Sequence, residues 1–163
     1  MKNENRTIYK LSFLILVISL STIMFIALRG DLLADSYGEN IGVKACQDCH
    51  AELVAGWQKT QHARAFDDLK KSKQEGLPDC QRCHVVGYGE TGGFIDYDLT
   101  PELVNVQCEE CHGAGKLHAA DPGKKGSITA KPGEQKCRKC HTPGQDKGFD
   151  YAKKIKGIHG PKQ

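Results

Sequence analysis

Four copies of the pattern Cys-x-x-Cys-His occur in this chain of 163 residues, and together they contain all eight of its cysteines. The copies are Cys46-Cys49-His50, Cys80-Cys83-His84, Cys108-Cys111-His112 and Cys137-Cys140-His141. This pattern is the attachment signature of c-type haem. The two thiols bond covalently to the haem, and the histidine becomes an axial ligand of the iron. The motifs therefore predict four haem c groups, held by eight cysteines and four histidines.

Two other uses of paired cysteines fit the pattern less well. Zinc ribbons also contain Cys-x-x-Cys units, but a site with four cysteine ligands does not need a histidine after every pair. A disulfide framework does not need the histidines either. Only seven of the 163 residues are histidine, so the chance of one at all four places is on the order of a few in a million. We therefore favour haem over zinc or disulfides.

The supply of iron ligands limits how many haems can bind two histidines. Four haems have eight axial positions, and the motif histidines fill half of them. The remaining histidines are His62, His118 and His159, which we expect to bind iron as well. Methionine is the usual alternative, but the chain has only Met1 and Met24, both in its N-terminal segment. One haem is thus expected to be five-coordinate or to use a rarer ligand such as lysine.

Spacing along the chain restricts which haem each spare histidine can reach. His62 follows His50 by twelve residues on a predicted helix, a separation of about 18 Å along its axis. His118 follows His112 by only six residues, a segment too short to pass easily around the edge of a porphyrin. We therefore expect both to bind haems other than the one nearest in sequence.

The N-terminus has the features of an export signal. Basic residues precede an apolar run at 11–28, as in a secretory signal peptide, and the run is just long enough to cross a bilayer. Cleavage after Ala34 and retention as a membrane anchor both remain open. We divide the chain into a signal peptide or anchor at 1–34 and a tetrahaem domain at 35–163. The charge bias predicts that this domain lies in the periplasm, free or tethered.

Composition suggests that the haems replace an ordinary core. From Asp35 onward only 20 residues are Leu, Ile, Val or Phe, a content too low for independent folding. We expect the chain without haem to be largely unfolded, as small metal-dependent domains are. Charge is divided unevenly, with −7 over residues 35–115 and +8 over residues 116–163. The basic part could steer an acidic redox partner, whereas we expect no nucleic-acid binding.

The predicted fold class is mainly α, with short helices and loops packed around four covalently attached haems and an N-terminal hydrophobic helix before them. Apolar spacing predicts the clearest helix over 50–73. The other expected elements are a glycine-rich loop at 87–93, a short strand at 94–97, a helix start at Thr100-Pro101, a loop over 121–136 and a closing helix over 150–158.

Sequence around the motifs resembles the cytochrome c-554 family of small tetrahaem periplasmic cytochromes. The resemblance covers about residues 44–160 and is carried by Trp57-Gln58-Lys59-Thr60-Gln61-His62, by Gly87-Tyr88-Gly89 and Gly92-Gly93-Phe94 after the second motif, by Val106-Gln107 and Gly113-Ala114-Gly115 around the third, and by Thr142-Pro143 and His159 after the fourth. It implies a mostly helical fold with stacked haem pairs. It also implies that His118 pairs with His50, His62 with His112 and His159 with His141, which leaves the haem on His84 open.

These features favour an electron-transfer protein over an enzyme. Our leading hypothesis is a tetrahaem carrier between periplasmic or membrane redox proteins whose identity the sequence does not give. The alternative is a small haem reductase of nitric oxide or a related nitrogen compound at the open haem. A third possibility is a sensor, or a structural subunit of a larger complex.

Overall fold

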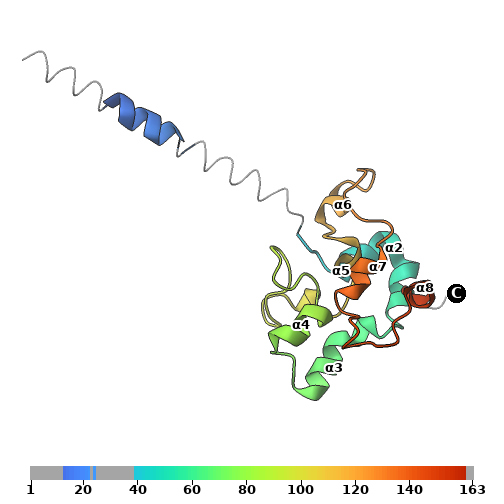
Figure 1. The fold of residues 1–163 in the computed structure, drawn as a ribbon. Coiled ribbons are helices and arrows are strands. Elements are labelled where there is room, and N and C mark those ends of the chain that lie inside the picture. The colour runs from blue at the N-terminus through green and yellow to red at the C-terminus, as the bar shows by residue number, and fades with distance from the viewer. Residues whose placement is uncertain (1–12, 23, 25–38, 161–163) are drawn as a thin grey trace, which may run out of the picture. The chain divides into compact units, whose positions relative to one another are not determined.

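Short helices joined by turns and loops make up residues 39–160 of the computed structural model (Figure 1). The structure describes residues 13–22, 24 and 39–160. The helices are α2 (Val43–Trp57), η1 (His62–Arg64), α3 (Ala65–Ser72), α4 (Pro78–His84), η2 (Pro101–Leu103), α5 (Cys108–His112), α6 (Lys116–Ala120), α7 (Glu134–Arg138), α8 (Tyr151–Lys154) and η3 (Ile155–Gly157). In this part of the chain the nearest approach to a sheet is one isolated bridge between Val85 and Val104. The predicted mainly helical class is confirmed.

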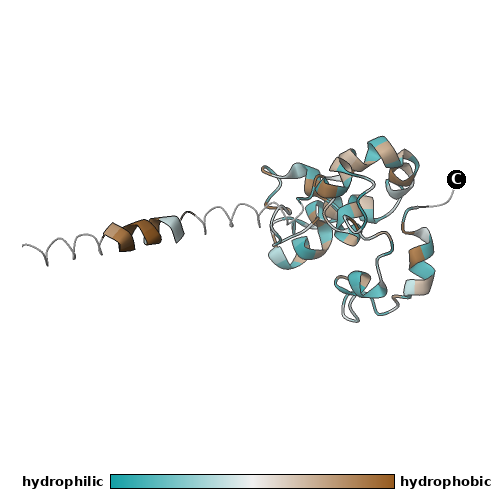
Figure 2. Cartoon of the chain, turned by 90° about the horizontal axis from the view of Figure 1, so that it is seen from above, coloured by the Kyte–Doolittle hydropathy of each residue, from teal (hydrophilic) through white to brown (hydrophobic). Residues whose placement is uncertain are grey.

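The N-terminal region forms a separate unit, Met1–Tyr37, distinct from the unit Gly38–Gln163. Residues 13–22 and 24 are helical and mostly apolar, as the brown colour in Figure 2 shows. The rest of the predicted apolar run over 11–28 lies outside the described residues. Among the residues that are described, no helix is both long and apolar enough to cross a membrane.

The helix predicted over 50–73 is interrupted. α2 ends at Trp57, residues 58–61 form a turn, and α3 begins only at Ala65. α2 is itself kinked, because His50 has the non-helical angles φ −125° and ψ 38°. α3 ends at Ser72, where Lys73 adopts a left-handed conformation with φ 56°. The prediction of helix for this apolar stripe is confirmed, but the prediction of one continuous helix is wrong. Turn hydrogen bonds replace helical ones at 58–61.

The short strand predicted at 94–97 is wrong. The Asp96 side chain accepts hydrogen bonds from the backbone N–H groups of Asp98 and Leu99, which closes a turn there. The Thr100 hydroxyl accepts from the Ile95 N–H instead of capping a helix, although Pro101 does open η2 as expected. Such local side-chain bonds offer the backbone an alternative to a strand.

Other boundaries are closer to expectation. The loop predicted over 121–136 ends earlier, because α7 begins at Glu134. The closing helix is present as α8 followed by η3, and the Asp150 side chain caps it by accepting from the Lys153 N–H. The glycine-rich loop turns as predicted, with positive φ at Gly87, Gly89 and Gly92.

A small apolar core lies next to the second motif. Its buried members come from four segments and are Phe66, Leu69, Val85, Val86, Phe94 and Leu103, with Cys80 and Tyr88 packed against them. Backbone hydrogen bonds join three of these segments, since the Val86 N–H donates to the Leu103 carbonyl and the Phe94 N–H donates to the Val86 carbonyl. So small a core agrees with the low apolar content of the sequence.

A buried carboxylate joins the first and third motifs. The Glu109 side chain is 3% exposed and accepts backbone N–H groups from Ile41, Gly42 and Gly115 at 2.6–3.0 Å. Beside it, the buried Gln107 side chain accepts from the Val43 N–H. Because hydrogen bonds to an ionised acceptor are the strong ones, these contacts hold the start of α2 against α5.

A second set of contacts positions the segment around His62. The Trp57 indole N–H donates to the Val106 carbonyl at 2.9 Å. The Val106 N–H in turn donates to the His62 carbonyl at 3.1 Å, and the Phe66 N–H donates to the side chain of Asn105 at 2.9 Å. The chain just before the third motif therefore fixes the turn that carries His62.

Candidate haem sites

Each Cys-x-x-Cys-His motif begins on a helical segment that ends or kinks near the motif histidine. The first motif is in α2, the second closes α4, the third forms α5, and the fourth starts in α7 and ends just after it. Residues three and four apart share one face of a helix. The two thiols and the imidazole of each motif can therefore face one porphyrin.

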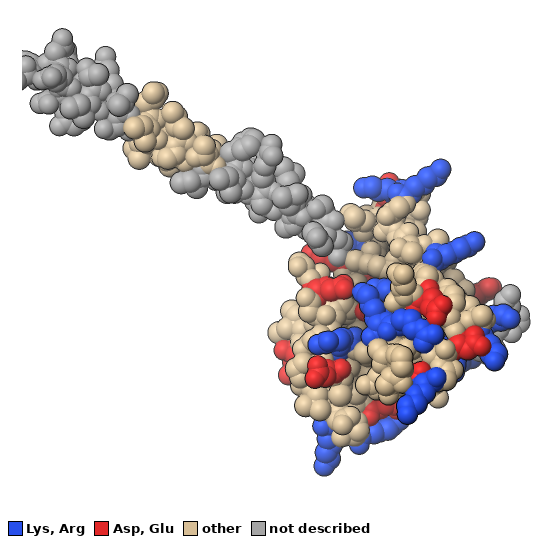
Figure 3. Space-filling model, viewed as in Figure 1, with Lys and Arg blue, Asp and Glu red and all other residues tan. Residues whose placement is uncertain are grey.

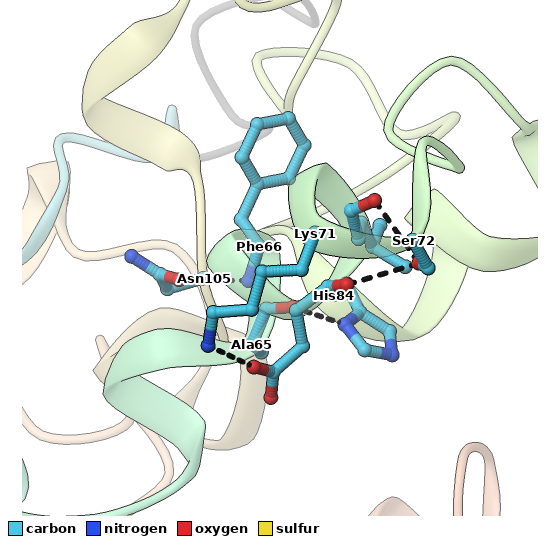
Figure 4. A network of polar contacts seen from close by, with 8 residues as sticks. Ala65, Phe66, Lys71, Ser72, His84 and Asn105 are labelled. Atoms are coloured by element: carbon cyan, nitrogen blue, oxygen red, sulfur yellow. Dashed lines mark hydrogen bonds and ion pairs between the residues drawn. The ribbon is translucent and has the colours of Figure 1, made fainter.

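Three of the four motif histidines have a hydrogen bond that suits them to bind iron. Nδ1 of His84 lies 2.5 Å from the Ala65 carbonyl oxygen, as Figure 4 shows, and Nδ1 of His112 lies 2.6 Å from the Thr129 carbonyl oxygen. Nδ1 of His141 lies 3.0 Å from a carboxylate oxygen of Asp146. An acceptor at Nδ1 places the proton there and leaves the Nε2 lone pair free for a metal.

Each spare histidine faces one motif histidine at the distance that a shared iron requires. The ring centroids are 6.3 Å apart for His50 and His118, 6.1 Å for His62 and His141, and 6.0 Å for His112 and His159. Two imidazoles on opposite sides of one metal ion, each bonded at about 2 Å, have centroids roughly 6 Å apart. The residues present therefore fit iron ligands at all three places.

Burial favours the neutral form of two of the spare histidines, which is the form that binds a metal. Burial lowers the pKa of His62, and the nearby His141 and His84 add to that effect. Burial also lowers the pKa of His159, with a further contribution from His112. The third spare histidine, His118, has a buried Nδ1 without a hydrogen-bond partner.

One motif histidine has no other histidine opposite it. All seven histidines of the sequence lie within residues 39–160, and the three pairs use six of them. The remaining one is His84, on α4. The ligand count from the sequence left one haem short of a histidine, and the pairing geometry assigns that position to the second motif.

Close approaches between thiols indicate which motifs are neighbours. The thiols of Cys46 and Cys108 are within hydrogen-bonding reach, as are those of Cys83 and Cys140. The interaction with Cys108 raises the pKa of Cys46, and the same interaction lowers the pKa of Cys108. Burial, with the nearby Cys137 and Glu110, raises the pKa of Cys111 to about 11. The first motif thus adjoins the third, the second adjoins the fourth, and the third adjoins the fourth.

Two cavities open beside these cysteines. One of about 310 Å³ is lined by Cys140 together with Arg82, Tyr88 and Glu110. Burial raises the pKa of Glu110, while the Gly87 N–H and Lys136 act in the opposite direction. The other cavity, of about 460 Å³, lies against Cys111. Space next to the attachment cysteines is what a covalently bound porphyrin needs.

The arrangement of the cysteines does not favour a zinc site or a disulfide framework. All eight cysteines are free thiols in this structure. In the part of the chain that the structure describes, which includes every cysteine and histidine, no group of three or more His, Cys, Asp or Glu side chains could hold a metal ion.

Comparison with known proteins agrees with the motif pattern. The family model for cytochrome c554 and c-prime matches residues 45–113. Cytochrome c-554 of Nitrosomonas europaea is 34% identical over 134 residues, which are 72% of this chain and 56% of that protein. The solved structure of reduced cytochrome c554 from the same organism superposes with a TM-score of 0.60 at 25% identity, over 76% of this chain and 84% of that one.

The chain belongs to the cytochrome c-554 family. Membership implies covalently bound haem c and confirms both the resemblance and the helical class stated from the sequence. The chain spans only 56% of the length of the curated cytochrome c-554.

Two of the histidine pairings implied by the cytochrome c-554 resemblance are exchanged in the structure. His118 lies opposite His50 as implied. His62, however, lies opposite His141, not His112, and His159 lies opposite His112, not His141. The bonds from Val106 to His62 and Trp57 decide the first of these placements. The approach of the C-terminal segment to α2 decides the second.

That approach depends on glycines that the sequence analysis did not consider. A Cβ atom at Gly56 would lie 2.1 Å from the carbonyl oxygen of His159, and one at Gly160 would lie 2.1 Å from the carbonyl oxygen of Gly56. Only a chain without side chains at these two places can come so close. Gly160 also has φ +86°, which favours glycine. The contact places His159 beside the third motif.

The sequence analysis also missed Asp146 and Glu109. Asp146 follows His141 by five residues, and that spacing alone gave no signal, because a turn at 142–146 brings the carboxylate back to the ring. Glu109 lies between the cysteines of the third motif, where a charged residue reads as exposed until its backbone partners are known.

Proposed function

We propose that this protein holds four haem c groups and carries electrons between redox partner proteins outside the cytoplasm. The observation that supports this most directly is the set of three histidine pairs, each of which joins one motif histidine to one spare histidine at the separation of two ligands on one iron. In the proposal His50, His84, His112 and His141 are the proximal ligands, and His118, His159 and His62 are the distal ones.

Electron transfer is the chemistry that such ligation suits best. An iron with two imidazoles has no open position for a substrate, and its geometry changes little on reduction. The contacts between motifs add a second argument, because α2 lies against α5, Glu110 pairs with Lys136, and Arg82 and Cys140 line one cavity, which favours the haem order first, third, fourth and second. Each haem in this order adjoins the next, so an electron could cross the protein in short steps.

Charge gives a basis for meeting partners. Residues 116–163 carry twelve basic and four acidic residues. Figure 3 shows lysine and arginine side chains spread over the face in view, with carboxylates between them. Surface charge accelerates the encounter of oppositely charged proteins, and salt weakens the effect. We therefore propose acidic surfaces on at least one partner.

Counting haems and ligands would test the proposal. Mass spectrometry of haem peptides should find haem on all four motifs. Electron paramagnetic resonance (EPR) of the oxidised protein should show three low-spin irons and one high-spin iron. Rapid mixing with a small reductant should then reduce all four haems together within the same short time. Fewer than four haems, or isolated haems that equilibrate slowly, would overturn it.

A second candidate function rests on His84, the motif histidine that has no other histidine ring facing it. Its haem would have an open position, which a reductase of nitric oxide or a related nitrogen compound requires. The neighbouring cavity is lined by possible proton donors, Arg82, Tyr88 and Lys139 among them. Turnover of nitric oxide, hydroxylamine or nitrite should exceed that of free haem and fall in Tyr88→Phe. Turnover no faster than free haem would remove this candidate.

We also propose that residues 1–34 direct export to the periplasm, followed either by cleavage after Ala34 or by retention as a tether. The support is the basic start and the apolar run over 11–28. Mass spectrometry of the mature N-terminus decides between the two outcomes. A protein found in the cytoplasm with its full N-terminus would contradict both.

A further inference from the structure

The fourth motif differs from the others in what its histidine bonds. His84 and His112 each face a backbone carbonyl oxygen through Nδ1. His141 faces the Asp146 carboxylate instead, at 3.0 Å. Among the motif histidines with a hydrogen bond in the described residues, it is the one whose acceptor carries a full negative charge.

The surrounding chain builds this contact in detail. The Asp146 N–H donates to the Thr142 carbonyl at 2.8 Å, which closes the turn after the motif and turns the carboxylate toward the ring. The Phe149 ring stacks on the His141 ring at 4.4 Å. The Arg138 guanidinium lies over the Phe149 ring, 4.7 Å from its centroid. The imidazole is therefore held both at its nitrogen and on its face, which leaves it little freedom to leave the carboxylate.

A carboxylate acceptor affects a metal-bound imidazole more than a carbonyl does. It draws the Nδ1 proton toward itself and so raises the basicity of the nitrogen that binds the metal. A more basic ligand, with a negative charge behind it, stabilises ferric iron more than ferrous iron. Hydrogen bonding of this kind beyond the ligand is one of the levers by which a protein sets a haem potential.

We propose that Asp146 is a positioning residue that lowers the reduction potential of the haem held by His141. This inference rests on the proposed function, since it requires His141 to be an iron ligand. Because the same haem lies between its neighbours on the third and second motifs, its potential controls how easily an electron crosses from one half of the haem series to the other.

The experiment is a spectroelectrochemical titration of the holoprotein and three variants. Asp146→Asn keeps the shape and a weaker acceptor but removes the charge, and Asp146→Ser gives a second neutral side chain. Glu134→Gln is the matched control: it removes one carboxylate near the same motif, where Glu134 pairs with Arg138 and is half-exposed. Haem peptides are counted by mass spectrometry in every sample before the titration.

The proposal expects a selective change. In Asp146→Asn one of the four potentials should rise by about 59 mV, which is a tenfold change in a one-electron equilibrium constant, while the other three stay in place. Glu134→Gln should leave all four near their original values. A shift of equal size in Glu134→Gln would assign the effect to local charge alone and overturn the proposal, as would an unchanged potential in Asp146→Asn.

Loss of the haem on His141 would be interpreted differently in the Asp146 variants and in the unsubstituted protein. If both neutral variants load three haems and lack the one on His141, Asp146 is needed for attachment, and the tuning role is overturned. If the unsubstituted protein itself carries no haem on the fourth motif, the proposed function fails instead. Loading of four haems in either neutral variant is enough for the titration to decide.

Discussion

Replacing Gly56 by alanine is a sharp test of how the proposed haem on His112 would obtain its second ligand. The new Cβ would lie 2.1 Å from the carbonyl oxygen of His159, whereas ordinary contacts begin at 3.4 Å, so that oxygen must recede by about 1.3 Å. Metal–ligand distances vary by only about 0.2 Å. The His159 segment can therefore satisfy either the packing or the bond to iron, but not both without strain.

The expected size of the effect follows from the cost of overpacking. Forcing one extra carbon into a tight contact costs about 1–3 kcal/mol, which lowers the ratio of ligated to unligated His159 by roughly 5- to 150-fold. The higher helix propensity of alanine stabilises α2 by about 0.5–1 kcal/mol, but it does so equally in both states. Thermal stability and ligation should therefore respond differently.

The assay is EPR of the oxidised Gly56→Ala holoprotein, together with its absorption spectrum after nitric oxide is added. We expect the high-spin signal to grow from one haem toward two and a second haem to bind nitric oxide. Gly157→Ala is the control, because a Cβ there meets nothing within 4 Å. A folded Gly56→Ala protein with the spectra of the control would refute the argument that this close approach positions His159.

Four further predictions concern other features of the protein. His118→Ala should remove the second ligand of the haem on His50 and add one high-spin iron to the EPR spectrum. An unchanged spectrum would show that His118 is not a ligand of that iron. The ring planes of His62 and His141 cross at 60°, whereas the planes in the other two pairs cross at 9° and 18°. One low-spin EPR signal should therefore be clearly more anisotropic than the other two. Three signals of equal anisotropy would contradict the geometry. Glu109→Ala should lower the free energy of unfolding by about 3 kcal/mol or more, since three backbone N–H groups lose a charged acceptor, as denaturant titration would measure; a loss below 1 kcal/mol would show that water replaces it. Protein made without haem attachment should show little helical circular dichroism and no cooperative melt.

The pairing of histidines shows where reasoning from the sequence reaches its limit. The number of possible histidine ligands follows from composition alone, and it predicted that one of four haems lacks a second histidine. Which haem that is depends on where three distant segments fold back. The exchange between His62 and His159 shows that a family resemblance can imply partners that differ from those in the structure, because the partner is decided by contacts such as the one between Gly56 and His159.

Local chemistry explains why some elements were predictable and others were not. The sequence alone determined the four Cys-x-x-Cys-His motifs, the helical class and the short closing helix near Tyr151, because each depends on residues within a few positions of one another. The tertiary structure alone decided the burial of Glu109 and the approach of the His159 segment to Gly56. These features depend on residues that folding brings into contact. The sequence does not show which group a charged or aromatic side chain will contact.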